Sequence, residues 1–295
     1  MGDQRTSNTV TQQRGDFLWT PNEAESKQVT QIGASACGAT AVINTLKALE
    51  VQRDQDYVAS TVYTRLRASS APLPEYLFSR SVAGVSHVDI IEGLDRASDG
   101  SVFARFFHFY PERQVDVQKW LTGWINRGVV PIATLNLQHV VNGETSIPDA
   151  WHHQMIYGVT KMGIHMCNPL SVEAPSNFLH FISSDSVLMI RRVDVISRWE
   201  ENTDLSVLSK HSDPRWKEMD VEGQVKKMLS EPEPYSQSPD RRPVGLLADW
   251  LFKSHICIPA VYKSGITLCV KKDDDAAYRL LVEEPELPLL VKPVS

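Results

Sequence analysis

The stretch from Gln31 to Leu49, QIGASACGATAVINTLKAL, constrains the fold of this chain more than any other segment. Small residues come first, at positions 33–35, and apolar residues then recur at helical spacing. Cys37 falls in the first turn of the predicted helix, where unpaired N–H groups and the positive end of the helix dipole favour a thiolate. Because the thiolate is the nucleophilic form, this stretch predicts a nucleophile at a helix start.

Gln31 precedes Cys37 by six positions. Its side-chain amide is close enough in sequence to return to the space beside the sulfur. An amide N–H there, together with the backbone N–H of Cys37, would stabilise an oxyanion. The stretch therefore supplies two of the four parts of an acyl-transfer site.

The other two parts are a histidine base and a group that orients it. Residues 151–170, WHHQMIYGVTKMGIHMCNPL, predict two strands, His152–Thr160 and Ile164–Asn168, joined by a tight turn. A hairpin of this kind makes His152 and Asn168 neighbours. Asn168 can then accept from one ring nitrogen of His152 while the other nitrogen faces a thiol.

Two adjacent histidines compete for the role of base. Neighbouring strand residues point to opposite faces, so we expect only one of them to meet the cysteine. The spacing to Gly158 and Asn168 selects His152. His153 is then expected to pack on the other face.

These residues, in this order and spacing, resemble the papain-like cysteine peptidases. A Gln, five residues and then Cys at a helix start are followed by a His, with Gly six and Asn sixteen residues further on. The pairs Cys37-Gly38 and Asn168-Pro169 are most similar to the bacteriocin-leader-processing (double-glycine) peptidases. The resemblance covers residues 29–199. It implies Gln31 as oxyanion donor, Cys37 as nucleophile, His152 as base and Asn168 as orienting residue.

Periodicity along the chain predicts helices first and a sheet later, the order of an α+β fold. The papain-like resemblance implies that the N-terminal helices, which carry the nucleophile, pack on an antiparallel sheet. Beyond the Cys37 helix, we expect helices at 58–69, 87–100 and 115–128, strands at 102–110 and 129–138, a loop at 70–84 and an exposed turn at 140–150. The predicted divisions are a flexible leader at 1–28 with an apolar clip at 17–19, a papain-like domain at 29–199, a charged linker at 200–245 and a C-terminal part at 246–295.

The last third carries no motif that assigns a function. The papain-like region is expected to end with a loop at 172–181 and a strand and short helix at 186–199. After it, the predicted elements are helices at 214–229 and 245–252, a hairpin at 256–270 turning at 263–265, and a docked strand at the C-terminal end. Two roles stay open for the residues after 245. They form a small appended α/β unit, or they contribute strands that complete the same sheet.

Composition narrows the class of partner. A net charge of −6, without a basic cluster among aromatic residues, argues against a nucleic-acid partner and favours a protein or peptide substrate. Four widely spaced cysteines and no signal peptide or membrane-spanning run predict a cytoplasmic protein. We expect no cofactor and no metal. The competing zinc hypothesis rests on His152, His153, His165 and Cys167, which lack a second ligand pair at structural-zinc spacing.

Three functions remain open from the sequence. The first is a cysteine peptidase that cleaves a peptide or isopeptide bond. The second is an acyltransferase in which an amine captures the same thioester. The third is a catalytically silent binding module in which Cys37 is a small core residue.

Overall fold

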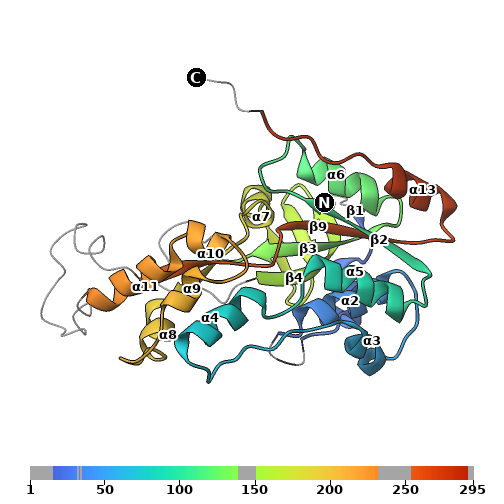
Figure 1. Ribbon diagram of the computed structural model, residues 1–295. Coiled ribbons are helices and arrows are strands. Elements are labelled where there is room, and N and C mark those ends of the chain that lie inside the picture. Colours follow the sequence, from blue (N-terminus) through green and yellow to red (C-terminus); the bar gives the residue numbers. More distant parts are fainter. Residues whose placement is uncertain (1–15, 32, 34, 139–150, 232–253, 292–295) are drawn as a thin grey trace, which may run out of the picture.

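The computed structural model describes residues 16–31, 33, 35–138, 151–231 and 254–291 (Figure 1). In these residues a seven-stranded sheet has the order β2-β9-β3-β4-β5-β6, with β1 also paired to β4. All of its strand pairs are antiparallel. The strands are β1 (Asp16–Phe17), β2 (Val102–His108), β3 (Val130–Asn136), β4 (Trp151–Thr160), β5 (Gly163–Met166), β6 (Ser171–Glu173) and β9 (Gly265–Lys271).

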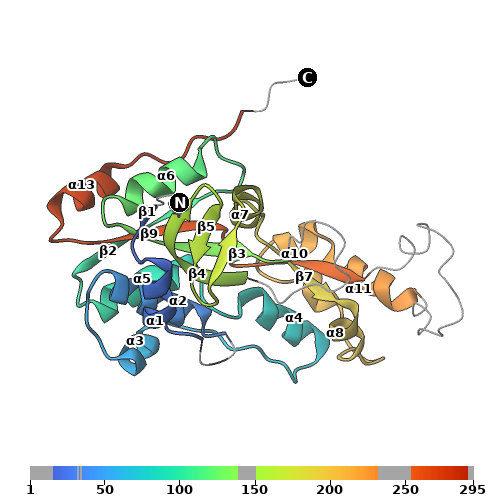
Figure 2. The same cartoon turned by 180° about the vertical axis from the view of Figure 1, so that it is seen from behind.

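Helices cover both faces of this sheet, as Figures 1 and 2 show from opposite sides. One face packs against α1 (Pro21–Lys27), α2 (Cys37–Ala48), α3 (Gln55–Thr61) and α5 (His87–Ala97). The other packs against α6 (Val117–Ile125), α7 (Pro175–Ile182) and α13 (Asp275–Glu283). Every residue of β3 is buried, as expected of a central strand covered on both faces.

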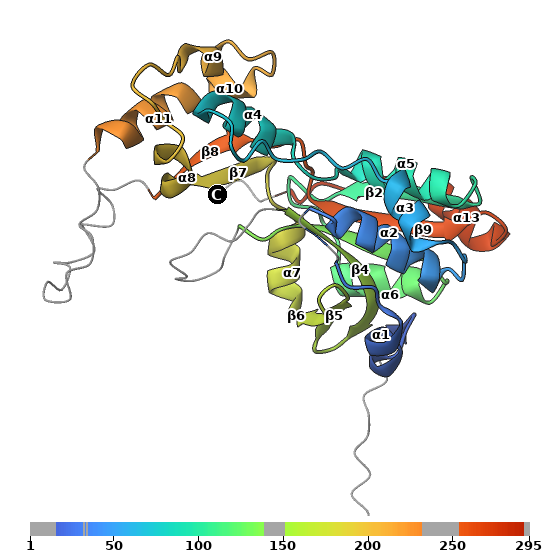
Figure 3. The same ribbon diagram turned by 90° about the horizontal axis from the view of Figure 1, so that it is seen from below.

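A second lobe extends from one end of the large sheet (Figure 3). Its two-stranded sheet pairs β7 (Val187–Arg191) with β8 (His255–Pro259). Around it lie α4 (Leu73–Val82), α8 (Arg192–Ile196), α9 (Ser206–Ser209), α10 (Arg215–Glu218) and α11 (Val221–Ser230). The lobe has its own apolar core around Trp216, which reaches the large sheet through Trp151.

The hairpin predicted at 256–270 is wrong, because its two strands belong to different sheets. β8 pairs with β7 in the second lobe, whereas β9 lies between β2 and β3 in the large sheet. Of the two roles left open for the last third, β9 therefore has the second, since it completes the main sheet. Strand propensity alone does not say which sheet a strand joins.

Two predictions between residues 58 and 84 are also wrong. The helix predicted at 58–69 is α3, which begins earlier because Asp54 caps it, and ends at Thr61, before the β-branched Val62, whose backbone is extended. The loop predicted at 70–84 contains α4, whose Pro74 lies in the first turn, where proline is tolerated.

Further corrections concern the second half of the chain and the N-terminal segment. The loop predicted at 172–181 contains α7, and the single helix predicted at 214–229 is divided into α10 and α11 at Asp220, whose φ is +49°. The leader interpretation does not hold for residues 16–27, which form β1 and α1, with Trp19 buried in the core. Residues 1–15 and the predicted elements at 140–150 and 245–252 lie outside the described residues.

The docked strand predicted at the C-terminal end is not formed within residues 287–291, where Leu289 makes only an isolated bridge with Arg113. The other element predictions agree with the structure, and the strand and short helix predicted at 186–199 are β7 and α8. The helices predicted at 87–100 and 115–128 are α5 and α6, and the strands at 102–110 and 129–138 are β2 and β3. The predicted hairpin is formed by β4 and β5. The α+β fold with an antiparallel sheet is thereby confirmed. No helix in the described part of the chain combines the length and apolar character needed to cross a bilayer.

Candidate active site

Cys37 is the first residue of α2, as predicted. The N-cap residue, Ala36, offers no side-chain acceptor, so capping does not compete with the thiol for the first-turn N–H groups. The cysteine is only 8% exposed. Gly38 lets the helix start approach Val85, because a Cβ on Gly38 would come within 2.7 Å of the Val85 side chain.

The sulfur of Cys37 lies against the main chain of β4. The backbone N–H groups of His153, Gly38 and Cys37 itself lower the pKa of the thiol, as does the nearby Arg67 guanidinium, but burial outweighs them and raises it. β5 pairs with β4 only from Ile156 onward, so this edge of β4 is open at residue 153. The thiol therefore lies beside the main chain of β4 at residue 153, where this edge of the strand is open.

The His153 ring is engaged at both nitrogens. Its Nε2 donates to the carbonyl oxygen of Val85 at 2.7 Å, and its Nδ1 lies 3.1 Å from Oγ1 of Thr134. Since a carbonyl can only accept, Nε2 carries the proton and Nδ1 accepts from the threonine hydroxyl. Burial lowers the pKa of His153 to about 4. This neutral, doubly bonded ring is not available as a base, in line with its predicted packing role.

His152 has the tautomer that a general base needs. Its Nε2 donates to the main-chain oxygen of Asn168 at 2.8 Å, which leaves Nδ1 as the nitrogen that can take up a proton. Burial lowers the pKa of His152, so the ring is neutral at neutral pH. The pairing of His152 with Asn168 was predicted, but the main-chain oxygen makes the contact rather than the side chain.

The Asn168 side chain has a different task. Its Oδ1 accepts from the main-chain N–H of Gln31 at 2.8 Å, while the main-chain N–H of Asn168 donates to Oε1 of Gln28 at 3.0 Å. Its φ of +64° is left-handed, a conformation that asparagine tolerates better than most residues. Asn168 therefore ties the loop before Cys37 to the strand end that holds His152.

Gln31 contacts Asn168 through its main chain rather than through its side chain. Its side-chain Nε2 donates to the carbonyl oxygen of Gly33 at 2.6 Å, and the residue is exposed. The amide is therefore not directed at the sulfur in this state, in contrast to the predicted oxyanion role. The backbone N–H of Cys37 remains as a donor at the helix start.

Two residues near Cys37 were not singled out from the sequence. Tyr262 is buried, its ring stacks on Trp151 at a centroid separation of 5.6 Å, and burial and the nearby Cys37 raise its pKa. Arg67 is the cation that acts on the cysteine. No motif marks either residue, because Tyr262 lies 225 positions after Cys37 and approaches it only in the folded chain.

The alternative zinc ligands are dispersed. His165 Nε2 lies 3.0 Å from the hydroxyl of Thr160, and Cys167 is fully buried, with burial raising its pKa to about 12. Within residues 16–138 and 151–291, as far as they are described, no group of three or more His, Cys, Asp or Glu side chains could hold a metal ion.

Comparisons with known proteins leave the family open. No protein-family model matches this chain, and no curated protein matches it. Among solved structures, the crystal structure of a candidate C39-like peptidase from Bacillus anthracis is similar with a TM-score of 0.35 and 13% identity, over 54% of this chain and 85% of that one. At this TM-score the similarity supports no conclusion about activity.

Proposed function

We propose that this chain is a papain-like cysteine hydrolase that cleaves a peptide or isopeptide bond, with Cys37 as nucleophile and His152 as base. The observation that carries the proposal is the His152 hydrogen bond to the Asn168 carbonyl. It fixes the tautomer with an unprotonated Nδ1, on the strand whose edge faces the thiol.

The reaction begins from a neutral pair. Burial raises the pKa of Cys37 and lowers that of His152, so the thiol and the imidazole are both uncharged before substrate binds. Nδ1 of His152 takes the thiol proton as the sulfur attacks the carbonyl carbon, and the backbone N–H of Cys37 donates to the resulting oxyanion.

Release of the products follows from the same groups. When the tetrahedral intermediate breaks its C–N bond, the His152 imidazolium gives its proton to the leaving amine. Water, deprotonated by His152, then hydrolyses the thioester and restores the free thiol. Asn168 holds the imidazolium through its main-chain oxygen without exchanging a proton.

The test is hydrolysis of a quenched fluorescent peptide library by the wild-type chain, Cys37→Ala and His152→Ala. We expect cleavage by the wild type, and a loss of at least about 100-fold in either variant, the lower end of what a positioned acid-base contributes. His165→Gln, which alters a ring that contacts the Thr160 hydroxyl outside the proposed site, is the control for a general structural effect. Cleavage that persists in Cys37→Ala would refute the proposal.

A catalytically silent binding module is the second candidate. It is favoured by the burial of Cys37 and by the Gln31 side chain, whose amide donates to Gly33 rather than facing the sulfur. In that case alkylation of Cys37 by iodoacetamide should be slow and unaffected by His152→Ala.

A dependence of product formation on added amine would instead identify an acyltransferase.

A further inference from the structure

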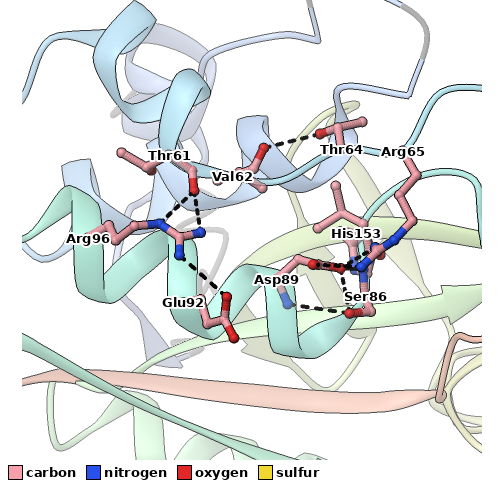
Figure 4. Close-up of polar contacts among 10 residues, drawn as sticks. Thr61, Val62, Thr64, Arg65, Ser86, Asp89, Glu92, Arg96 and His153 are labelled. Atoms are coloured by element: carbon pink, nitrogen blue, oxygen red, sulfur yellow. Dashed lines mark hydrogen bonds and ion pairs between the residues drawn. The ribbon is translucent and has the colours of Figure 1, made fainter.

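A closed set of polar contacts joins Arg65, Ser86 and Asp89 next to His153 (Figure 4). The Asp89 carboxylate, on α5, is only 5% exposed. It accepts from the backbone N–H of Ser86 at 2.8 Å, from the Ser86 hydroxyl at 2.6 Å, and from two nitrogens of Arg65 at 2.7 and 3.1 Å. Such a forked, charge-assisted contact holds both partners in one geometry.

The main chain of Arg65 closes the set. Its N–H donates to the Gly84 carbonyl at 3.0 Å, and its carbonyl accepts from the Gly84 N–H at 2.7 Å. Arg65 and Asp89 therefore fix the chain on both sides of Val85: Gly84 through the backbone of Arg65, and Ser86 through the carboxylate.

Val85 is the residue that touches the site. Its side chain packs against Gly38 at the start of α2, and its carbonyl accepts from the His153 ring. The main chain of His153 in turn lies beside the Cys37 sulfur. One short segment thus sets the position of the cysteine helix and of the strand that the thiol faces.

We propose that Asp89 is a positioning residue for Cys37: with Arg65 it fixes Val85, which through Gly38 and the His153 ring holds the β4 backbone N–H against the sulfur. This inference rests on the proposed function for its catalytic meaning. Its structural content is independent of turnover.

The charge state of Asp89 suits this role. Burial raises the pKa of the carboxyl, but the hydrogen bonds from Arg65 and Ser86 outweigh it and leave the pKa lowered. The carboxylate is therefore ionised at neutral pH and keeps both partners. Val85 and His153 lie between Asp89 and the Cys37 sulfur in this series of contacts. The loss of the carboxylate therefore acts on Cys37 through these two residues.

The experiment compares the pH dependence of iodoacetamide alkylation of Cys37, mapped by mass spectrometry, in the full-length wild type, Asp89→Asn and Glu92→Gln. Glu92 is the matched control, because it lies on the same helix and loses the same charge, but its ion-pair partner in the described part of the chain is the exposed Arg96 at 3.4 Å. We expect the alkylation midpoint of Asp89→Asn to rise by about one pH unit, since the thiolate loses a fixed N–H donor. The midpoint of Glu92→Gln should match the wild type.

A folded Asp89→Asn protein whose midpoint is unchanged or lower would overturn the inference, even if its melting temperature falls, because a merely structural role predicts that result. Should Asp89→Asn not fold, Arg65→Lys replaces it, since lysine keeps the charge but not the forked contact. We then expect a smaller upward shift, and a midpoint equal to that of Glu92→Gln would overturn the inference.

The outcome is separable from that of the proposed function. Alkylation of Cys37 needs no substrate, so the Asp89 comparison stands if peptide hydrolysis is never observed. Conversely, hydrolysis that requires Cys37 and His152 would support the proposed function even where Asp89→Asn leaves the alkylation midpoint unchanged.

Discussion

At the scale of single residues, the candidate site depends on which groups stay uncharged and which backbone positions allow close approach. Cys37 and His152 are neutral partners, and burial lowers the pKa of His152 below the ordinary histidine value of about 6.5. Activity should therefore increase with pH over the range below 6.5 in which His152 loses its proton. Gly38 and Asn168 act through backbone geometry instead. Both can be tested without a substrate.

Gly38→Ala should destabilise the chain by about 1–3 kcal/mol, because the new Cβ meets Val85 at 2.7 Å in a packed region. Urea unfolding followed by circular dichroism measures the change. The control is Gly123→Ala in α6, where the nearest atom is the flexible end of Arg127 at 3.4 Å. There, we expect a neutral or slightly stabilising effect. Equal effects at the two positions would contradict the close approach.

Asn168→Ala should cost about 1–3 kcal/mol, because it removes the acceptor of a half-buried hydrogen bond from the Gln31 main-chain N–H and places a less tolerant residue at φ +64°. Asn168→Asp keeps both the acceptor and the backbone tolerance, so most of the stability should return. Chemical denaturation of the wild type, Asn168→Ala and Asn168→Asp measures the three free energies of unfolding. If aspartate is as destabilising as alanine, the side-chain acceptor is not what holds the loop.

At the scale of elements, the N-terminal segment is part of the core. Phe17 of β1 packs over Gly158 and stacks on Tyr157, and Trp19 enters the core beside α2. This confirms the apolar clip predicted at 17–19. It also places α1 directly before the loop that leads to Cys37.

Trp19→Ala should lose about 3–5 kcal/mol of stability and release α1, seen as faster hydrogen exchange at 21–27. Trp19 is 4% exposed, whereas Trp199 is 38% exposed and serves as the control. Trp199→Ala should cost much less and leave α1 protected. Unchanged exchange in Trp19→Ala would show that the clip does not hold the segment.

At the scale of the whole molecule, the large sheet is completed by β9, a strand near the C-terminal end of the chain. β9 supplies the only link between β2 and β3 among the described strands. A chain ending at residue 199 should therefore lack cooperative unfolding, although it contains every predicted site residue. Differential scanning calorimetry would detect this. A sharp transition in the truncated chain would mean that residues 29–199 fold alone.

Acid lability is a second property of the whole molecule. Burial is the main cause that lowers the pKa values of His87, His108 and His153 to about 4. Unfolded histidines bind protons near pH 6.5, so their contribution to stability is complete above that pH and is lost as the pH falls toward 4. His87→Phe keeps the stack on Phe106. The free energy of unfolding should therefore fall between pH 6.5 and 4.5 by on the order of 1–2 kcal/mol less in this variant than in the wild type, as measured by urea titration at the two pH values. An unchanged difference would contradict the prediction.

The sequence by itself determined the parts whose signals are local. The helix start at Cys37, the β4–β5 hairpin and the adjacency of His152 and Asn168 follow from spacings of at most about twenty residues. Periodicity, turn residues and small-residue loops act over that range. For the same reason the α+β class could be predicted.

Only the tertiary structure decided the rest, because long-range pairing leaves no local signature. It separated β8 from β9 and brought Tyr262 beside Cys37. It also placed the Arg65–Asp89 pair on both sides of Val85, although the sequence indicated only two ordinary helix residues. A strand or side chain acquires its partner from the packing of the whole chain, and that packing is not encoded in the spacing of any one segment.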